Sequence, residues 1–464
     1  MGEKSTNLEV SADELVARLL SLEASAKLAL LDSCGRSLGG SKFLIAGIYP
    51  TETFEYNCQT QRDAFAALQF LDEKLQFYQT RQDPTQPFGG GICVATFAYE
   101  FGPLLEDLRL ERKESDRASE PSVTLTFYET FVVHDYSVSR SFIVGKQAQE
   151  LAKILDGRIS ILKHHDVPMV LRKPTELPAQ FVSSNFTENE YLAAVEKIRQ
   201  HIMRGDIYQA NLTQQLCLKL PENIESEQVF LNLRRSHPAP FAAFLRRAND
   251  CVVSASPERF FKVQSPKSKA QGRIITTSPI KGTRRRGKTP EEDLLLRREL
   301  EQSSKDKAEN VMIVDLLRND LGRVCEFGSV KAEKLFEIEE HPTLFHLVSS
   351  VRGCLRKNAE ISDLLKAAFP CGSITGAPKI RAMQILHEIE TAPRGLSMGA
   401  LGYFAFDGSA DLSVAIRTMT ICDRTAVFNV GGGIVFDSQP ESEYEESWLK
   451  AQALLNATGI NIPN

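Results

Sequence analysis

The fold class follows from the run Thr418-Met-Thr-Ile-Cys422 and from the run Ala426-Val-Phe-Asn-Val430, which leads directly into Gly431-Gly-Gly433. Both runs are rich in β-branched and apolar residues, which is typical of strands. A helix is expected next, from Pro440 towards Leu455. This succession predicts mixed α and β structure with antiparallel sheet.

The same alternation of strand-like and helical stretches covers the chain from residue 187 onward. Thr187 and Glu190 form a capping-box pattern, and apolar residues at helical spacing continue to Gly205, so a helix is expected there. Two more helices are predicted, one after Ser303 and one over Lys379–Ile389. Other strand-like runs in this part are Pro240–Leu245, Cys251–Ser254 and Arg273–Thr277.

Three regions are predicted along the chain. Residues 1–165 mix helical patches with strand-like runs such as Phe43–Ile48, and Arg109–Glu120 has the charged, aperiodic composition of an exposed loop. Residues 166–186 are the best candidate for a linker. Residues 187–460 form the region that carries the chemistry.

Length and composition limit the classes of function. A chain of 464 residues is long enough for two domains or subdomains, and 42% hydrophobic with 25% charged residues is ordinary for a soluble protein. The net charge of −5 gives no reason to expect nucleic acid or an anionic membrane as a partner. Nine dispersed cysteines, with no Cys-x-x-Cys pair, suit reduced thiols, and no signal or membrane-spanning pattern occurs, so a cytoplasmic location is expected.

Lys281 is the first candidate for catalysis. It lies in Ser278-Pro-Ile-Lys-Gly-Thr-Arg-Arg-Arg-Gly287, between an isoleucine and a Gly-Thr turn, with three arginines just downstream. Nearby cations and desolvation disfavour a charged ammonium group, and an uncharged lysine is a nucleophile. Without further context, the alternative that Lys281 is a solvated surface cation is more common.

Carboxylates on two predicted helices form a second candidate group. Glu443 and Glu446 share one face of the last helix with Lys450, and Glu309 lies among apolar residues of the helix after Ser303. Two glutamates on one face suit Mg²⁺, and the N–H groups of the preceding glycines can approach a carboxylate closely. The alternative is that the two glutamates only complement a helix dipole.

At this point the chain resembles the chorismate-utilising family, which includes anthranilate synthase large subunits, isochorismate and salicylate synthases, and aminodeoxychorismate synthase component I. The resemblance covers about residues 250 to 450, with the motifs in the family's order, and is weak over residues 1–165. The matching stretches are Ser256-Pro-Glu-Arg259, Pro279-Ile-Lys-Gly-Thr283, Ala308–Asp320, His346-Leu-Val-Ser349, Phe369-Pro-Cys-Gly-Ser-Ile-Thr-Gly-Ala-Pro-Lys379, Ile416-Arg-Thr418, Gly431-Gly-Gly-Ile-Val435 and Glu443-Tyr-Glu-Glu446. This resemblance implies an α+β fold of two subdomains, in which antiparallel β-sheets pack as a sandwich with helices outside.

Two positions distinguish the members of the family. Anthranilate synthases usually carry alanine where this chain has Lys281, whereas aminodeoxychorismate synthases carry lysine. Isochorismate-type enzymes place a general-base lysine where this chain has Gln209, and a neutral amide cannot accept that proton. Both positions favour aminodeoxychorismate synthase component I, a transferase that makes 4-amino-4-deoxychorismate from chorismate and ammonia for 4-aminobenzoate and folate synthesis.

The resemblance also implies roles for individual residues. Lys281 would add to chorismate as a nucleophile, and Glu258 would protonate the leaving oxygen. Mg²⁺ would be held by Glu309 and Glu446, with Glu443 in support. The expected substrate-binding residues are Arg417, Tyr403, Gly432, Gly433, Lys450, Thr283, His346 and Thr375. Cys371 stands where relatives more often have a smaller residue, and it is interpreted as packing.

Two partners are expected from the resemblance. Ammonia would come from a separate glutamine amidotransferase subunit, because no stretch of this chain resembles an amidotransferase. Leu30-Leu-Asp-Ser33 resembles a stretch that lines a tryptophan pocket in feedback-inhibited relatives, although it could equally be a turn after a helix. A regulatory or structural tryptophan pocket is therefore expected from Ser33, Ser41, Lys42, Phe43, Pro240 and Phe241.

Two rival functions remain open at this stage. The first is an anthranilate synthase large subunit, which would release a fluorescent product. The second is a catalytically dead subunit that only binds a partner or ligand. Retention of Lys281, Glu258, Glu309 and Glu446 argues against the second, because a binding module has no need of all four.

Overall fold

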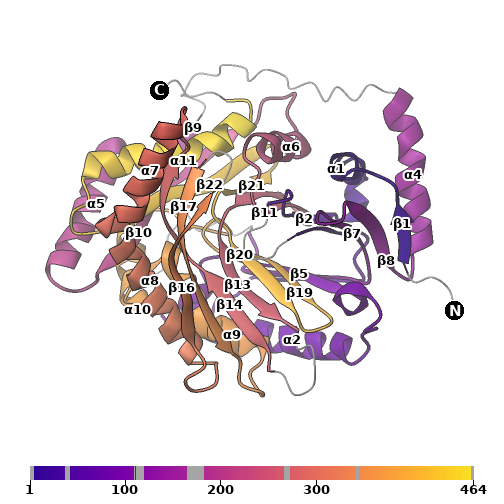
Figure 1. Cartoon of the computed structure of the whole chain (residues 1–464), viewed down its shortest axis with the longest axis horizontal. Coiled ribbons are helices and arrows are strands. Elements are labelled where there is room, and N and C mark those ends of the chain that lie inside the picture. The colour runs from indigo at the N-terminus through magenta and orange to yellow at the C-terminus, as the bar shows by residue number, and fades with distance from the viewer. Residues whose placement is uncertain are drawn as a thin grey trace.

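The computed structural model describes residues 5–36, 42–108, 110, 120–164, 182–265, 272–340 and 344–460. Two large sheets pack against each other, and helices lie along their outer faces (Figure 1). The paired strands run antiparallel. The predicted α+β fold class is confirmed. No helix within the described ranges is long and apolar enough to cross a bilayer.

The first sheet has twelve strands among the described residues. Its strand β9 (Val182–Ser184) pairs with β10 beside the main path. The main path runs through β1 (Ser5–Leu8), β8 (Arg140–Gly145), β7 (Thr130–Asp135), β3 (Phe43–Gly47), β2 (Ala29–Asp32), β11 (Phe241–Arg246), β12 (Cys251–Ser256), β21 (Thr418–Cys422), β22 (Thr425–Ile434), β10 (Gln209–Lys219) and β18 (Gly376–Ala377).

The second sheet has ten strands in the same described ranges. Its strand β16 (Lys331–Glu340) pairs with β17 beside the main path. The main path runs through β15 (Ile280–Arg285), β17 (Leu344–Cys354), β14 (Ile274–Ser278), β13 (Arg259–Gln264), β20 (Ala410–Val414), β19 (Ala400–Ala405), β5 (Ile92–Phe97), β6 (Val123–Tyr128) and β4 (Glu52–Tyr56).

The helices cover the two outer faces of the sandwich (Figure 1). They are α1 (Ala12–Leu20), α2 (Gln61–Gln79), α3 (Phe101–Leu105), α4 (Ala148–His164), α5 (Glu188–Met203), α6 (Ser226–Ser236), α7 (Pro290–Gln302), α8 (Ser304–Gly322), α9 (Ile361–Ala368), α10 (Lys379–Ile389) and α11 (Pro440–Ala457).

The sandwich follows from alternation along the strands. Successive side chains of a strand point to opposite faces of its sheet. In β3, Ile45 joins a core between the sheets that also contains Val94 of β5, whereas its neighbours Leu44 and Ala46 join the core under α1, α4, α6 and α11. A third core lies between the second sheet and α2, α8 and α9. Strands with two apolar faces are therefore buried on both sides.

Strands from both halves of the chain share each sheet. β2 pairs with β11, and β5 pairs with β19, so residues 1–165 and residues 187–460 contribute to one continuous sandwich. Most of the predicted linker lies outside the described residues, as do residues 109 and 111–119 of the predicted loop. The predicted domain boundaries stay a prediction.

Most local predictions agree with the structure. Helix α5 begins after Thr187 with the expected capping box, and α10 spans Lys379–Ile389. The strand predicted to end in the three glycines is present as β22, which runs through them to Ile434 and pairs with β10 along that length. One prediction was wrong: the turn predicted around Gly282 lies inside strand β15.

Candidate functional site

Lys281 projects from β15 beside helix α8. The strand pairs with β17 and carries a bulge between Ile280 and Thr283, where Gly282 adopts a φ of +82°. A Cβ at Gly282 would lie 2.8 Å from Leu300 Cδ1 and 2.9 Å from Asp306 Cγ, so only glycine lets the strand pass the helices this closely. The side chain of Lys281 is 13% exposed, and its Nζ lies 3.9 Å from Oε2 of Glu309.

The three arginines after Lys281 do not form its surroundings. Arg284 pairs with Glu299 and Asp306, Arg285 with Glu292, and Arg286 with Asp293, all on α7 or α8. The sequence predicted that these arginines would disfavour the charged form of Lys281, but each arginine is instead neutralised by a helix carboxylate. The charged groups that face Lys281 are carboxylates, among them Glu309 and Glu258.

Glu258 lies in the tight connection between β12 and β13 and is 5% exposed. Burial raises the pKa of its carboxyl to about 7, and this rise is opposed by the Ser373 hydroxyl, the Lys281 ammonium and the N–H of Ile280. Glu258 is therefore protonated over much of the range below neutral pH. A buried, protonated carboxyl next to an amine can act as a general acid.

Glu309, Glu443 and Glu446 lie on two helices that face the end of β22. Burial raises the pKa of Glu309 and of Glu443, and the charge of Glu446 adds to both rises. Glu443 accepts a hydrogen bond of 2.7 Å from the Ser438 hydroxyl. The side chain of Glu446 is 51% exposed, and Lys450 Nζ, 2.7 Å from its Oε1, contributes to its lowered pKa. The three carboxylates therefore act on one another and on nearby lysines as one charged group.

The donor set of these glutamates fits a hard divalent cation. Among the described residues, no group of three or more His, Cys, Asp or Glu side chains forms a complete metal cage. Mg²⁺ does not require one, since it usually binds one or two carboxylates together with waters and substrate oxygens. Burial, which raises the pKa values of Glu309 and Glu443, disfavours their charged forms, and a bound divalent cation would favour those charged forms again.

Gly432 and Gly433 form the floor between the glutamates and Lys281. A Cβ at Gly432 would lie 3.2 Å from Oε2 of Glu443 and 3.6 Å from Oε1 of Glu446. A Cβ at Gly433 would lie 2.5 Å from Nε2 of Gln209 and 3.5 Å from Nζ of Lys281. Side chains here would occupy the space in front of these groups, so the glycines keep it open. We call residues Gly431–Gly433 the glycine cradle.

Arg417 is suited to bind an anion. It lies just before β21 with a φ of +48°, which is uncommon for a residue other than glycine. Burial lowers the pKa of its guanidinium group, and within the described ranges no carboxylate lies within ion-pair distance of it. Arg417 is half-buried; a partly desolvated cation without a counterion is costly, and a substrate carboxylate would balance it.

Thr283 and His346 face each other across β15 and β17, with 2.9 Å between Thr283 Oγ1 and His346 Nδ1. Both therefore lie on the strand pair that holds Lys281. Thr375 is fully buried in the turn before β18, and its carbonyl accepts a hydrogen bond from the N–H of Asn211 on β10. The sequence-predicted residues from β15, α8, β22 and α11 are thus brought together.

The comparison with known proteins covers nearly the whole chain. A family model described as chorismate binding enzyme matches residues 30–456. The chain belongs to this family.

Relatives of this chorismate binding enzyme carry two different names. This chain is 35% identical over 454 residues to anthranilate synthase component 1 of Bacillus pumilus, and the match covers 92% of this chain and 86% of the relative. It is 32% identical over 444 residues to aminodeoxychorismate synthase component 1 of Bacillus subtilis (strain 168), covering 92% and 91%. The crystal structure of anthranilate synthase component I from Streptococcus pneumoniae TIGR4 superposes with a TM-score of 0.72 at 28% identity, covering 90% of this chain and 93% of that one.

This chorismate binding enzyme has a cavity where the tryptophan pocket was predicted. The cavity encloses about 420 Å³, including space open to solvent, and lies between β2, β3, β11 and β19. Its lining includes four of the predicted residues, namely Ser33, Phe43, Pro240 and Phe241. Lys42 is exposed directly before Phe43, and Ser41 lies outside the described residues.

Tyr403 does not join the Lys281 group. It lines the same cavity as Ser33, on β19, and four strands separate β19 from β15 in the second sheet. At the usual strand spacing this is about 24 Å across the sheet. The predicted role of Tyr403 in binding the same substrate as Lys281 therefore does not fit its position. Sequence motifs do not show where in a sheet the strand that carries a residue lies.

Two residues beside the site were missed from the sequence, namely Lys305 and Ser373. Lys305, one helical turn before Glu309, acts on the charges of Glu309, Glu443 and Glu446, and this i, i+4 spacing was the available signal. Ser373 acts on Glu258 from within the motif that contains Cys371. Cys371 itself is buried, with its sulfur 3.3 Å from the Ser373 hydroxyl, so it packs behind the acid.

Gln209 is buried, and both polar atoms of its side chain lack a hydrogen-bond partner within the described structure. Unpaired buried amides are rare in folded proteins. Its Nε2 lies beside Gly433, which in turn neighbours Lys281. The amide is positioned to contact a bound molecule in front of the glycine cradle.

Proposed function

We propose that this chain is component 1 of aminodeoxychorismate synthase, a transferase that converts chorismate and ammonia into 4-amino-4-deoxychorismate. The observation that carries the proposal is the position of Lys281. Its amine faces the glycine cradle, with the buried acid Glu258 on one side and Glu309 on the other. Anthranilate synthases usually have alanine at this position, and no alanine could supply a nucleophile there.

The proposed reaction proceeds in two displacements. The amine of Lys281 forms a bond to C2 of chorismate, the ring double bond shifts, and the C4–O bond breaks. Glu258 donates its proton to the departing oxygen, which leaves as water. Ammonia then forms a bond to C4, the C2–N bond to Lys281 breaks, and the proton released from the new amine returns to Glu258.

The remaining residues bind and orient the substrate. Arg417, Lys450 and the N–H groups of Gly432 and Gly433 contact its two carboxylates. Thr283, His346 and Thr375 shape the surrounding wall. Glu309 and Glu446, supported by Glu443, hold Mg²⁺. When bound, Mg²⁺ neutralises and orients the ring carboxylate of chorismate.

We further propose that a glutamine amidotransferase subunit supplies the ammonia. The names of the relatives, which are component 1 of anthranilate or aminodeoxychorismate synthases, support the existence of a second component. An isolated chain supplied with ammonium salt would then bypass the second component, which makes the activity accessible to direct assay.

The product made by the isolated chain distinguishes the proposed activity from that of an anthranilate synthase. Relatives with both names have similar sequence identity to this chain, so identity alone does not separate the two. With chorismate, ammonium salt and MgCl₂ we expect no fluorescent anthranilate. Product should appear only when an aminodeoxychorismate lyase is added, as 4-aminobenzoate, and chelation with EDTA should suppress it. Anthranilate formation would assign the rival function, and no chorismate consumption would favour a binding subunit.

We also propose that the cavity at Ser33 binds tryptophan. The hydroxyl of Ser33 is buried without a hydrogen-bond partner in the described structure, and Asp32 beside it accepts from Arg234 and Tyr136. The aromatic walls of Phe43 and Phe241 suit an indole, and the polar end suits an amino acid.

Calorimetry checks the tryptophan pocket. We expect one molecule of L-tryptophan to bind per chain, with about tenfold weaker binding in Ser33→Ala, because that change removes only a hydroxyl. L-leucine serves as the control ligand and should release no comparable heat. Absence of heat with tryptophan, together with no tryptophan released from denatured purified protein, would rule the pocket out.

A further inference from the structure

Strand β10 has an interrupted edge at the centre of the site. On one side it pairs with β22 over Ala210–Lys219. On the other side β18 pairs with residues 209–210 and β9 with residues 216–218, so no strand of the described residues covers the stretch between them. Unpaired backbone groups in a buried place are costly, and the fold must satisfy them in another way.

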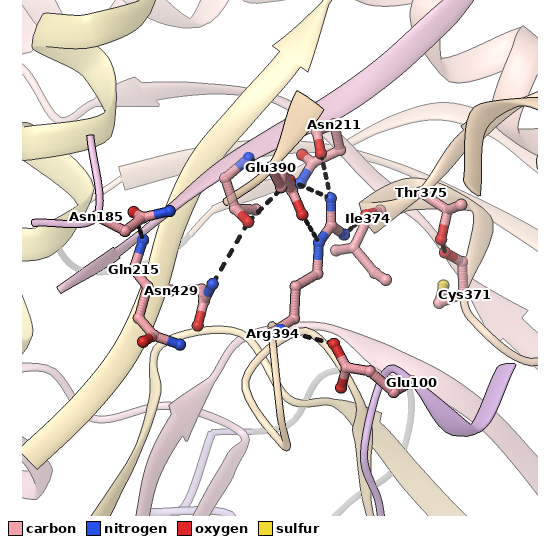
Figure 2. A network of polar contacts seen from close by, with 11 residues as sticks. Glu100, Asn185, Asn211, Gln215, Cys371, Ile374, Thr375, Glu390, Arg394 and Asn429 are labelled. Atoms are coloured by element: carbon pink, nitrogen blue, oxygen red, sulfur yellow. Dashed lines mark hydrogen bonds and ion pairs between the residues drawn. The ribbon is translucent and has the colours of Figure 1, made fainter. Parts of the chain in front are cut away.

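A buried ion pair fills much of this gap. The guanidinium of Arg394 donates to the carbonyl of Asn211 at 2.6 Å, and Glu390 accepts from the N–H of Thr213 at 2.8 Å. Arg394 also holds both oxygens of Glu390, at 2.9 and 2.7 Å, and its side chain is only 1% exposed. Figure 2 shows the guanidinium of Arg394 between Glu390 and Asn211.

The same guanidinium holds the turn that carries Thr375. It donates to the carbonyl of Ile374 at 2.7 Å, and the carbonyl of Thr375 in turn accepts from the N–H of Asn211 at 2.9 Å. One planar group therefore joins the turn before β18 to β10. Five fixed N–H donors make arginine suited to such a junction, whereas lysine offers a single point charge.

Residues of the N-terminal half fix the backbone of Arg394. The N–H groups of Arg394 and Gly395 donate to the two oxygens of Glu100 at 2.7 and 3.0 Å, and the ring of Tyr99 lies 4.2 Å from the guanidinium. Glu100 and Arg394 are labelled in Figure 2. The guanidinium is thus held from behind as well as in front, so its position is well defined.

The residues held in this way lie opposite the glycine cradle. Asn211 pairs with Gly433, Leu212 with Gly432, and Thr213 with Gly431. We propose that Arg394 is a positioning residue which, with Glu390, takes the place of a missing strand along Asn211–Thr213. It thereby holds the glycine cradle and the Thr375 turn in register beside Lys281. The part of this inference that concerns turnover rests on the proposed function.

The test compares Arg394→Lys with a matched variant. Arg246 has the same arrangement elsewhere in the fold: its guanidinium binds Glu227 and the carbonyls of Leu20 and Leu22. Arg246→Lys therefore removes an equivalent set of guanidinium hydrogen bonds at a distance from Lys281. Thermal melting of both variants establishes how much stability each loses, and all assays are run well below the lower melting temperature.

For Arg394→Lys we expect kcat for chorismate amination to fall roughly 10- to 100-fold, because small misplacements of a site are costly in rate. The Mg²⁺ concentration for half-maximal activity should change less than about threefold, since α8 and α11 carry those ligands. Arg246→Lys should keep wild-type kcat. A wild-type kcat in Arg394→Lys, or an equal loss in both variants, would overturn the positioning role.

Amide hydrogen exchange gives a readout that does not depend on the reaction. In Arg394→Lys the amides of Asn211 and Thr213 should exchange at least about tenfold faster, while those of β17 stay unchanged. Arg246→Lys should show wild-type exchange at Asn211 and Thr213. If the wild-type chain does not aminate chorismate, the exchange result still decides the structural part. Unchanged exchange at both amides in Arg394→Lys would refute it.

Discussion

Replacing Lys281 by alanine is expected to reduce ammonia-dependent turnover of chorismate by roughly 1,000-fold or more, because the nucleophile of the proposed first displacement is lost. The surrounding structure should persist, since Lys281 lies at the edge of the second sheet and, among the described residues, pairs only with Glu309, at 3.9 Å. Acid quenching of the wild-type reaction, followed by intact mass measurement, should show a chain carrying dehydrated chorismate. The alanine variant should show none.

Lys281→Arg is the matched control for charge. Arginine keeps a cation beside Glu309 but is effectively always protonated, so it cannot attack carbon. If Lys281 acts as a nucleophile, the arginine variant should be as inactive as the alanine variant and should form no adduct. Substantial recovery with arginine would assign Lys281 an electrostatic role, and wild-type turnover in Lys281→Ala would show that the nucleophile assignment is wrong.

Local patterns predicted the parts of this fold whose causes are local. The capping box at Thr187 and the helical spacing after Lys379 fixed two helices, since both depend on residues within a few positions of each other. Alternating apolar runs located most strands. The pairing partner of β22 could not be predicted in this way, because β10 lies more than 200 residues earlier in the chain.

The site shows the same limit. The motif order identified Lys281, Glu258 and the glutamates, and the structure places them around the glycine cradle. The partners of Arg284, Arg285 and Arg286 could not be foreseen, because they depend on how α7 packs on β15. Arg394 gave no signal at all in the sequence, since its decisive contact with Asn211 spans 183 positions.

Glu258→Gln is expected to make the protein less active and more stable at alkaline pH. The pKa of Glu258 is about 7 in the folded chain, above the ordinary value of 4.5, with burial as the main cause. Between these values the folded state binds more protons than the unfolded state, so this carboxyl lowers stability as pH rises from about 4.5 to 7. Glutamine has no such titration. At pH 8 the variant should gain up to about 3 kcal/mol over the wild type, and below pH 4.5 that gain should vanish.

Glu258→Gln should lower activity, although it raises stability at alkaline pH. A general acid contributes roughly 100- to 10,000-fold, and glutamine cannot donate the proton, so kcat should fall by a factor in that range. In the wild type, kcat/KM at a fixed concentration of free ammonia should decline as pH rises above about 7, because Glu258 loses its proton there. In the variant this decline should disappear from the residual activity.

Asp72→Asn is the control that separates proton donation by Glu258 from the effect on stability of burying a carboxyl group. Burial also raises the pKa of Asp72, which accepts from the N–H of Ser362 where α2 meets α9, and the asparagine oxygen can keep that hydrogen bond. This variant should shift stability with pH in the same direction as Glu258→Gln and leave kcat unchanged. Wild-type kcat in Glu258→Gln would mean that another group protonates the leaving oxygen. A loss of kcat in Asp72→Asn equal to that of Glu258→Gln would mean that the effect is carried by stability rather than by proton donation.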